Sequence, residues 1–414
     1  MINVRTNNQS GAVSLFVVVF AMLIITVITV SFLRLMMDDQ RQASNNDLSQ
    51  SAYDSAQAGV EDAKRALLKY QQDCSSNPGS CDTYGAALTT DKCNAALNGI
   101  SSSSLPLPNG SYPEIKVQQS LTGDDDILDQ AYTCVTITLQ TQDYLGELAA
   151  NESQLVPLFS SKPFDRVRVE WFSKEDLSVT TGPTTVDLPG VVSGTNQPLY
   201  EQGEWPSDRP PLLRAQLVQF AHTFTLNNFD VVSGAQSNGA TVFLYPTKQT
   251  GITDRAFTNY DFRKTSATDD ADPKNPINTP LPVTCAENLN SGGYSCATNL
   301  VLPQAISATG IGDRTAFLRL AAFYKAAHFR VTLWNGPVDL ANPPVDPVKF
   351  KDVQPLVDST GRANDLFRRI QSRVDLYDTS FPYPEGTIDV TGNFCKDFAI
   401  TDTQYIPGGT SCTP

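Results

Sequence analysis

The sequence predicts an α+β protein in which one long N-terminal helix packs on a large, mostly antiparallel β-rich head with disulfides. Three observations predict this class. An apolar stretch near the N-terminus continues into an amphipathic helical pattern with no proline before Pro78. Short segments that alternate apolar and polar residues follow after Asp129. All eight cysteines lie beyond the apolar stretch, which indicates disulfides formed in an oxidising compartment.

The apolar stretch is expected to be a membrane anchor. No charged residue occurs between Arg5 and Arg34, and residues 12–33 are long enough to cross a hydrocarbon core of about 30 Å. No small-x-small cleavage site follows, so a cleaved secretory signal is not favoured. Because Arg34 is soon followed by Asp38 and Asp39, we expect a single-pass protein with its N-terminus in the cytoplasm and its head outside.

The helical pattern does not end at the membrane. Beyond the apolar part, small or apolar residues recur at spacings of three and four, which places them on one face of a helix. These residues are Ala52, Ala56, Val60, Ala63, Leu67 and Tyr70. A helix from Ala12 to Tyr70 would be about 90 Å long, with an apolar membrane half and an amphipathic half that packs on the head.

This layout resembles that of the type IV pilins. A short polar leader ends at Gly11, as before a prepilin-peptidase cut, and the segment "AQAGVEDA" (residues 56–63) is similar to the "A-E-A-G-L/V-x-x-A" pattern of PilX-type minor pilins. The resemblance covers about residues 8–70. It implies cleavage between Gly11 and Ala12, storage in the cytoplasmic membrane, and later assembly with other pilin subunits by the pilus machinery.

Two positions depart from the pattern of the major pilins. Phe16 stands at the fifth mature position, where major pilins carry a glutamate, and Arg5 is the only basic residue of the leader. A neutral fifth residue is usual in PilX-type and tip-initiating subunits. The resemblance therefore implies a minor subunit at or near the pilus tip, where it would support pilus assembly and contact a host or other surface.

The cysteines fall into three local groups. We expect the pairs Cys285–Cys296 and Cys395–Cys412 because their members are close in sequence. Cys74, Cys81, Cys93 and Cys134 allow three pairings, among which Cys74–Cys81 with Cys93–Cys134 is slightly preferred. No Cys-x-x-Cys motif occurs and no histidine has a zinc-ligand spacing, so a zinc site is not indicated.

The rest of the chain divides by composition. A short helix is expected near Ala87–Leu97, strands are expected from 131 onward, and residues 315–324 and 329–334 are expected to form a β-hairpin. The stretch "STGRANDLFRRIQSRVDLY" resembles the late strand of pilin-like sheets, and this resemblance implies a polar loop that leads into an arginine-rich strand. The predicted parts are a leader (1–11), the helix (12–70) with its membrane span (12–33), cysteine- and serine-rich loops with the first strands (71–180), a linker or long loop (181–211) and a β-rich C-terminal head (212–414).

The sequence carries little sign of chemistry. With 44 acidic and 30 basic residues the net charge is −14, which argues against a nucleic-acid partner. The common nucleotide-binding, zinc-protease and serine-hydrolase motifs are missing, and the nearest match, Gly293–Ala297, lies in a loop-like stretch. His222 is expected in a strand and His328 in a solvated turn. We therefore expect a protein that is not an enzyme and needs no cofactor.

Two acidic loops and three aromatic residues leave weaker alternatives. Carboxylates could bind calcium, although neither loop has a recognised spacing; they are Asp124, Asp125, Asp126 and Asp129 in one loop and Asp269, Asp270 and Asp272 in the other. Trp205, Tyr245 and Tyr260 could form an adhesive surface or pack in a core.

The sequence thus favours a minor type IV pilin of PilX type. A permanently anchored surface adhesin or receptor is the first alternative, and an anchored extracellular hydrolase is the second.

Overall fold

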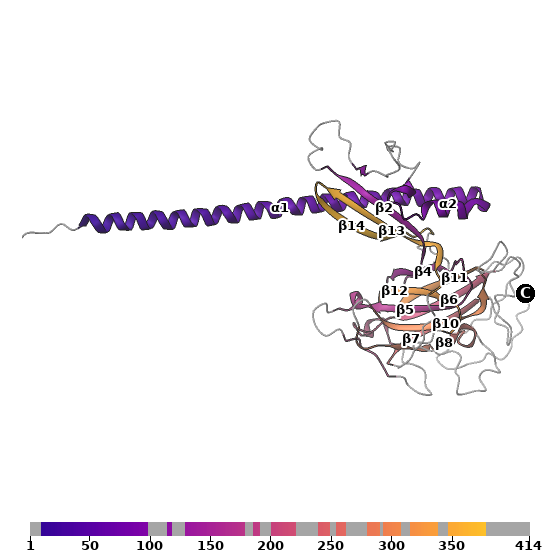
Figure 1. Cartoon of the computed structure of the whole chain (residues 1–414). Helices are drawn as coiled ribbons and strands as arrows, with labels where there is room; N and C mark the ends of the chain where they lie inside the picture. The colour runs from indigo at the N-terminus through magenta and orange to yellow at the C-terminus, as the bar shows by residue number, and fades with distance from the viewer. Residues whose placement is uncertain are drawn as a thin grey trace, which may run out of the picture. The chain divides into compact units, whose positions relative to one another are not determined.

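The computed structural model describes residues 10–97, 114–117, 129–178, 185–190, 200–220, 239–248, 254–261, 280–289, 293–307, 315–337 and 347–377. These residues form one long helix, a four-stranded sheet and a ten-stranded sheet (Figure 1). The predicted α+β class is confirmed at this level: a long apolar N-terminal helix joins a large, antiparallel-rich β head with disulfides.

Helix α1 runs without interruption from Ser10 to Ser76. It extends six residues beyond the predicted end at Tyr70, because Gln71 to Ser76 contain no helix breaker. The side chain of Gln71 donates to the carbonyl of Leu376 (2.6 Å), which secures this extra turn. The helix ends where Pro78 disfavours a helical conformation of Asn77.

The second half of α1 lies along the four-stranded antiparallel sheet (Figure 1). The strand order is β1 (Ile115–Lys116), β2 (Ala131–Thr141), β13 (Phe350–Ala363) and β14 (Leu366–Arg373). Apolar residues of β2 and β13 that point toward the helix are buried, whereas Thr138 and Gln140 of β2 are exposed. This alternation is typical of a sheet with one covered face.

Strand β13 corrects the prediction of a polar loop at "STGRA". Residues 359–363 belong to the 14-residue strand β13, which pairs with both β2 and β14. The resemblance to pilin-like sheets implied a loop here, but Ser359 and Gly361 meet α1. A Cβ on Gly361 would overlap the backbone of Ala52 and Ala56, so only glycine allows this approach of helix and strand.

The ten-stranded sheet has the order β3-β12-β5-β10-β9-β7-β6-β11-β4, with β8 also paired to β10. All its pairs are antiparallel except β7–β9 and β8–β10. The bounds are β3 (Asp143–Leu148), β4 (Ser153–Pro157), β5 (Phe164–Ser173), β6 (Leu212–Phe220), β7 (Gly239–Thr247), β8 (Asp254–Ala256), β9 (Leu281–Cys285), β10 (Tyr294–Ile306), β11 (Thr315–Phe323) and β12 (Ala327–Trp334).

This sheet curls around one apolar core. Alternate residues from its strands, such as Val169, Leu217 and Leu318, belong to the same buried cluster. The two ends of the sheet meet, since Gln154 of β4 donates to the hydroxyl of Tyr144 in β3 (2.8 Å).

The predicted hairpin of β11 and β12 is wrong. Both segments are strands, but β11 pairs with β6 and β4, whereas β12 pairs with β5 and β3. Five strands separate them in the sheet order. Both bury residues in the same core, and the short connection at Tyr324 joins strands that lie near opposite ends of the sheet order. The alternating pattern predicts a strand but not its partner.

Two segments outside the strands also bear on the predictions, the one around Ala87–Leu97 and residues 181–211. The helix predicted near Ala87–Leu97 lies earlier, as α2 (Cys81–Leu88), and only a 3-10 turn occurs at Ala95–Leu97. Each sheet combines strands that precede residues 181–211 in sequence with strands that follow them. In the described parts of this segment, Val186 and Trp205 are buried.

Candidate functional site

The candidate functional site is the N-terminal half of α1, from Leu15 to Met37. Its large apolar side chains are 44–73% exposed, and an 18-residue window has a mean hydropathy of 2.9. Apolar surface of this extent is costly in water, at about 25 cal/mol per Å². One N-terminal helix is therefore long and apolar enough to span a membrane.

The hydroxyl side chains within this half are satisfied by the helix itself. Thr26 donates to the carbonyl of Leu23 (2.8 Å), Thr29 to Ile25 (2.8 Å) and Ser31 to Val27 (2.8 Å). Hydroxyl groups bonded to the preceding turn leave no unsatisfied donor for lipid. The three hydroxyl residues are thus compatible with a hydrocarbon environment.

A polar helical segment separates the apolar half from the sheet. Residues 38–47 are exposed on all sides, and Leu48 is the first side chain that is partly covered. From Met37 to Ser49 the helix rises about 18 Å. The head is consequently held away from the end of the apolar half by about three helical turns.

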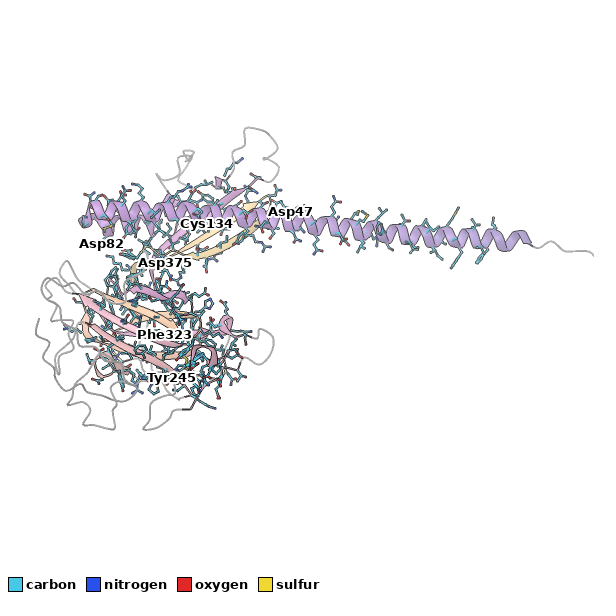
Figure 2. The ribbon with its side chains drawn as sticks, turned by 180° about the vertical axis from the view of Figure 1, so that it is seen from behind. Asp47, Asp82, Cys134, Tyr245, Phe323 and Asp375 are labelled. Atoms are coloured by element: carbon cyan, nitrogen blue, oxygen red, sulfur yellow. A yellow bond between two sulfur atoms is a disulfide. The ribbon has the colours of Figure 1, made fainter. Side chains whose placement is uncertain are left out.

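The amphipathic half fastens this helix to the head (Figure 2). The structure buries the whole predicted stripe, Ala52, Ala56, Val60, Ala63, Leu67 and Tyr70. Ser359 donates to the carbonyl of Ala56 (2.7 Å), a bond that only a close contact between helix and strand permits.

Two tyrosines add hydrogen bonds at the edges of this contact. The hydroxyl of Tyr132 donates to Asp62 (2.6 Å), and that of Tyr70 donates to Asp352 (2.9 Å). Burial, followed by these carboxylates, raises the pKa of both tyrosines far above the ordinary value. Both hydroxyls therefore stay protonated and keep donating at any physiological pH.

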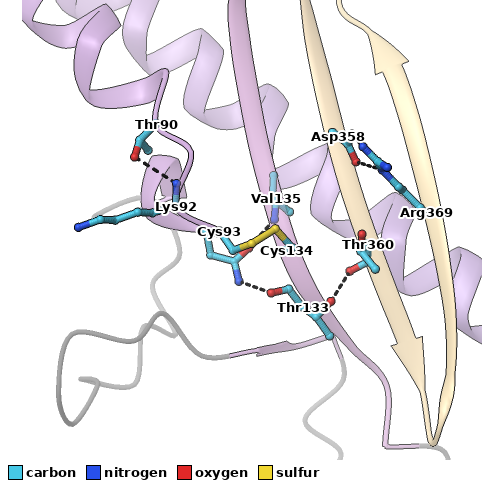
Figure 3. Close-up of a disulfide and its surroundings, with 10 residues drawn as sticks. Thr90, Lys92, Cys93, Thr133, Cys134, Val135, Asp358, Thr360 and Arg369 are labelled. Carbon is cyan, nitrogen blue, oxygen red and sulfur yellow. Dashed lines mark hydrogen bonds and ion pairs between the residues drawn. A yellow bond between two sulfur atoms is a disulfide. The ribbon is translucent and has the colours of Figure 1, made fainter.

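Three disulfides join parts of the described chain: Cys74–Cys81, Cys93–Cys134 and Cys285–Cys296. They are the pairs that the sequence favoured. The first links the end of α1 to α2, the second ties the following turn to β2 (Figure 3), and the third joins paired residues of β9 and β10. Cys395 and Cys412 lie outside the described residues.

Gly11 and Ala12, the predicted cleavage site, lie in the first turn of α1, which begins at Ser10. Phe16 lies in the exposed half of the helix.

His328 corrects the prediction of a solvated turn. His328 is the second residue of strand β12, and its Nδ1 lies 2.7 Å from the Oδ1 of Asp176. Burial alone would lower the pKa of His328, but Asp176, helped by Glu147 and Glu175, raises it above the ordinary value. The contacts between Asp176 and His328 hold the start of β12. His222 lies outside the described residues.

The other candidates for chemistry are structural where they are described. Ser295 is buried and donates to the carbonyl of Ala286 (2.9 Å). Asp129 pairs with Arg362 (2.7 Å), whose hydrogen bond and charge lower the pKa of Asp129. Among the residues that the structure describes, no group of histidine, cysteine and carboxylate side chains could hold a metal ion. The six remaining aspartates of the two acidic loops lie outside them.

The three aromatic candidates pack against the head. Trp205 and Tyr245 are buried, and Tyr260 is partly buried against the main core. Trp205 stacks on Tyr324 (4.2 Å between centroids), and the guanidinium of Arg209 lies 5.5 Å from its ring centroid. Core packing, the second of the two expected alternatives, therefore describes Trp205 and Tyr245.

Comparison of the chain with protein-family models, with curated proteins and with solved structures finds no match.

Proposed function

We propose that this protein is a minor type IV pilin of PilX type, held in the cytoplasmic membrane by the first half of α1. The observation that carries the proposal is a single helix whose apolar half is exposed and whose other half is fixed to a β head. Such a helix can lie in lipid and later exchange lipid for other apolar helices, since neither step requires the head to rearrange.

The proposal also includes the partners. Prepilin peptidase cuts between Gly11 and Ala12, the assembly machinery lifts the helix out of the bilayer, and other pilin subunits pack around it. Phe16 at the fifth mature position suits a subunit at or near the tip, where no subunit lies ahead to be paired by a glutamate. The head then faces outward, where it supports assembly and adhesion, without enzymatic activity or a cofactor.

The test is the intact mass and N-terminal sequence of the protein from cells with and without prepilin peptidase. A chain that starts at Ala12 only when the peptidase is present supports the proposal. A chain that keeps its leader in both strains leaves the anchored adhesin or receptor, which the exposed helix suits equally well.

A matched pair of variants sharpens this test. Gly11→Val should leave the leader in place, because the peptidase that the resemblance implies requires a small residue before the cut, whereas the neighbouring Ser10→Ala should be processed normally. Equal processing of both variants would contradict the assigned cleavage site.

A further inference from the structure

A groove of about 490 Å³ lies where the C-terminal turns of α1 meet α2. Its lining is mainly apolar, with small side chains beside two tyrosines. It includes Ala66, Tyr70, Tyr84, Leu88 and Ala96. This volume falls within the range of sites that accept a side chain or a small ligand.

The walls of the groove are fixed by covalent bonds. Cys74–Cys81 holds the end of α1 to the start of α2, and Cys93–Cys134 holds the opposite wall to β2. Asn94 strengthens the second wall, since its side chain accepts from the amide of Val135 (2.8 Å) and donates to the carbonyl of Thr133 (3.2 Å). A groove with fixed walls binds without the entropic cost of ordering them.

Among the residues that line the groove, two are cations, Lys69 and Lys92, and one is an anion, Asp73. Lys69 pairs with Asp73 across one turn of α1 (3.1 Å), so these two charges offset each other. Lys92 also lines the groove; it is exposed and makes no ion pair within the described part of the chain. Its amide donates to the hydroxyl of Thr90 (3.3 Å), which shapes the loop that presents it (Figure 3). A protein with a net charge of −14 thus presents a cation beside an apolar groove.

We propose that this groove binds a partner protein, which inserts an apolar, preferably aromatic, side chain and pairs an adjacent carboxylate with Lys92. Enclosed small-molecule sites surround most of their ligand, but this groove is open along α2, where Ala86 and Ala87 are exposed. An open groove suits an anchor side chain that projects from a protein surface. The inference does not depend on the proposed function, because a pilin and an anchored receptor would both present this groove.

The test uses full-length protein in phospholipid nanodiscs and fluorine NMR of the blocked dipeptide N-acetyl-4-fluorophenylalanyl-glutamate amide. We expect saturable line broadening by the wild type, and about tenfold weaker binding when the glutamate is replaced by lysine. Ala87→Trp fills the groove and should abolish the broadening. Unchanged disulfides and far-ultraviolet circular dichroism show that each variant is folded.

The decisive variant is Lys92→Glu, a surface substitution that should reverse the preference, so that the lysine dipeptide binds more tightly than the glutamate dipeptide. Lys162→Glu, at another exposed lysine of the head, is the matched control and should leave the preference unchanged. An unreversed preference in Lys92→Glu overturns the proposal. Tighter binding of 3-(4-fluorophenyl)propionate than of the dipeptide also overturns it, because a free acid would then be the better ligand.

Discussion

Three small residues determine how closely α1 approaches its sheet. Gly59 faces Ser359 and Val135, Gly361 faces the helix backbone, and the Ser359 hydroxyl bridges to the carbonyl of Ala56. A larger side chain at any of these positions would push the helix away and leave a gap in the packed layer. Protein interiors are close-packed, so even one methyl group matters here.

Gly361→Ala should therefore destabilise the four-stranded sheet by about 1–3 kcal/mol, the usual cost of overpacking. The measurement is the free energy of opening of β13 amides by hydrogen exchange. Gly190→Ala is the control, because a Cβ there meets nothing within 4 Å. Equal protection in both variants would show that the contact at Gly361 is looser than described.

His328 gives the head a pH dependence. Its pKa is raised in the folded state by Asp176, so the protonated form is stabilised by folding. This contribution is fully present below the ordinary pKa of about 6.5 and is lost as the pH rises through the folded value. The partner Asp176 also accepts from the amide of His328 (3.1 Å) and from that of Ser173 (2.6 Å).

His328→Asn should consequently lower the melting temperature more at pH 5 than at pH 8, by the equivalent of about 1 kcal/mol. Differential scanning calorimetry at the two pH values measures the difference. The same loss at both values would mean that the imidazole contributes by packing alone.

At the scale of elements, α1 consists of two halves with different surroundings and no break between them. Its first half is covered by nothing in the described chain, while its second half is covered by β2, β13 and β14. The disulfide Cys74–Cys81 stands at the far end of the second half, and Cys93–Cys134 joins the chain just before the turn at Ala95–Leu97 to β2. They hold an element with too small a core to be stable alone.

Removing the second of these disulfides should loosen this corner. We expect the double variant Cys93→Ala/Cys134→Ala to lose about 2–4 kcal/mol, because the bond closes a chain segment with a separation of 41 residues. Hydrogen exchange should locate the loss at Asn94 and at the start of β2.

Cys285→Ala/Cys296→Ala is the comparison for the same experiment, since that bond joins strands within the larger sheet. If the comparison variant lost as much protection at Asn94 as Cys93→Ala/Cys134→Ala does, the role of Cys93–Cys134 would not be local.

At the scale of the whole molecule, an acidic head is joined to a helix whose residues 12–33 are apolar and carry no charge. The net charge of −14 keeps the head soluble, and the exposed apolar half requires lipid or other apolar helices. One chain can hold both parts because the polar helical turns of residues 38–47 separate the head in water from the apolar half in lipid.

A charge in the middle of the apolar half should prevent membrane association. Ile25→Asp costs about 2.5–3.5 kcal/mol at the centre of a bilayer, so we expect a large fraction of the protein to move from the carbonate-washed membrane pellet to the supernatant. Gln40→Asp, in the polar segment, should stay in the pellet. Retention of both variants would mean that α1 is not what holds the protein to the membrane.

The sequence by itself determined the helix, its two halves, most strands and the pair Cys285–Cys296, whereas it left three pairings open among Cys74, Cys81, Cys93 and Cys134. These features follow from local periodicity, from the absence of helix breakers and from short cysteine spacings, all of which can be read without knowing what lies nearby in space. The span of Leu15–Met37 and the stripe from Ala52 to Tyr70 are the clearest examples.

Only the tertiary structure decided which strands pair and what the polar residues do. β11 and β12 are adjacent in sequence but do not pair with each other, and "STGRA" is a strand that the backbone of α1 covers. The groove beside Lys92 arises from α1, α2 and a turn that only the fold brings together. Partner choice in a sheet depends on long-range packing, and one strand's alternation is compatible with many partners.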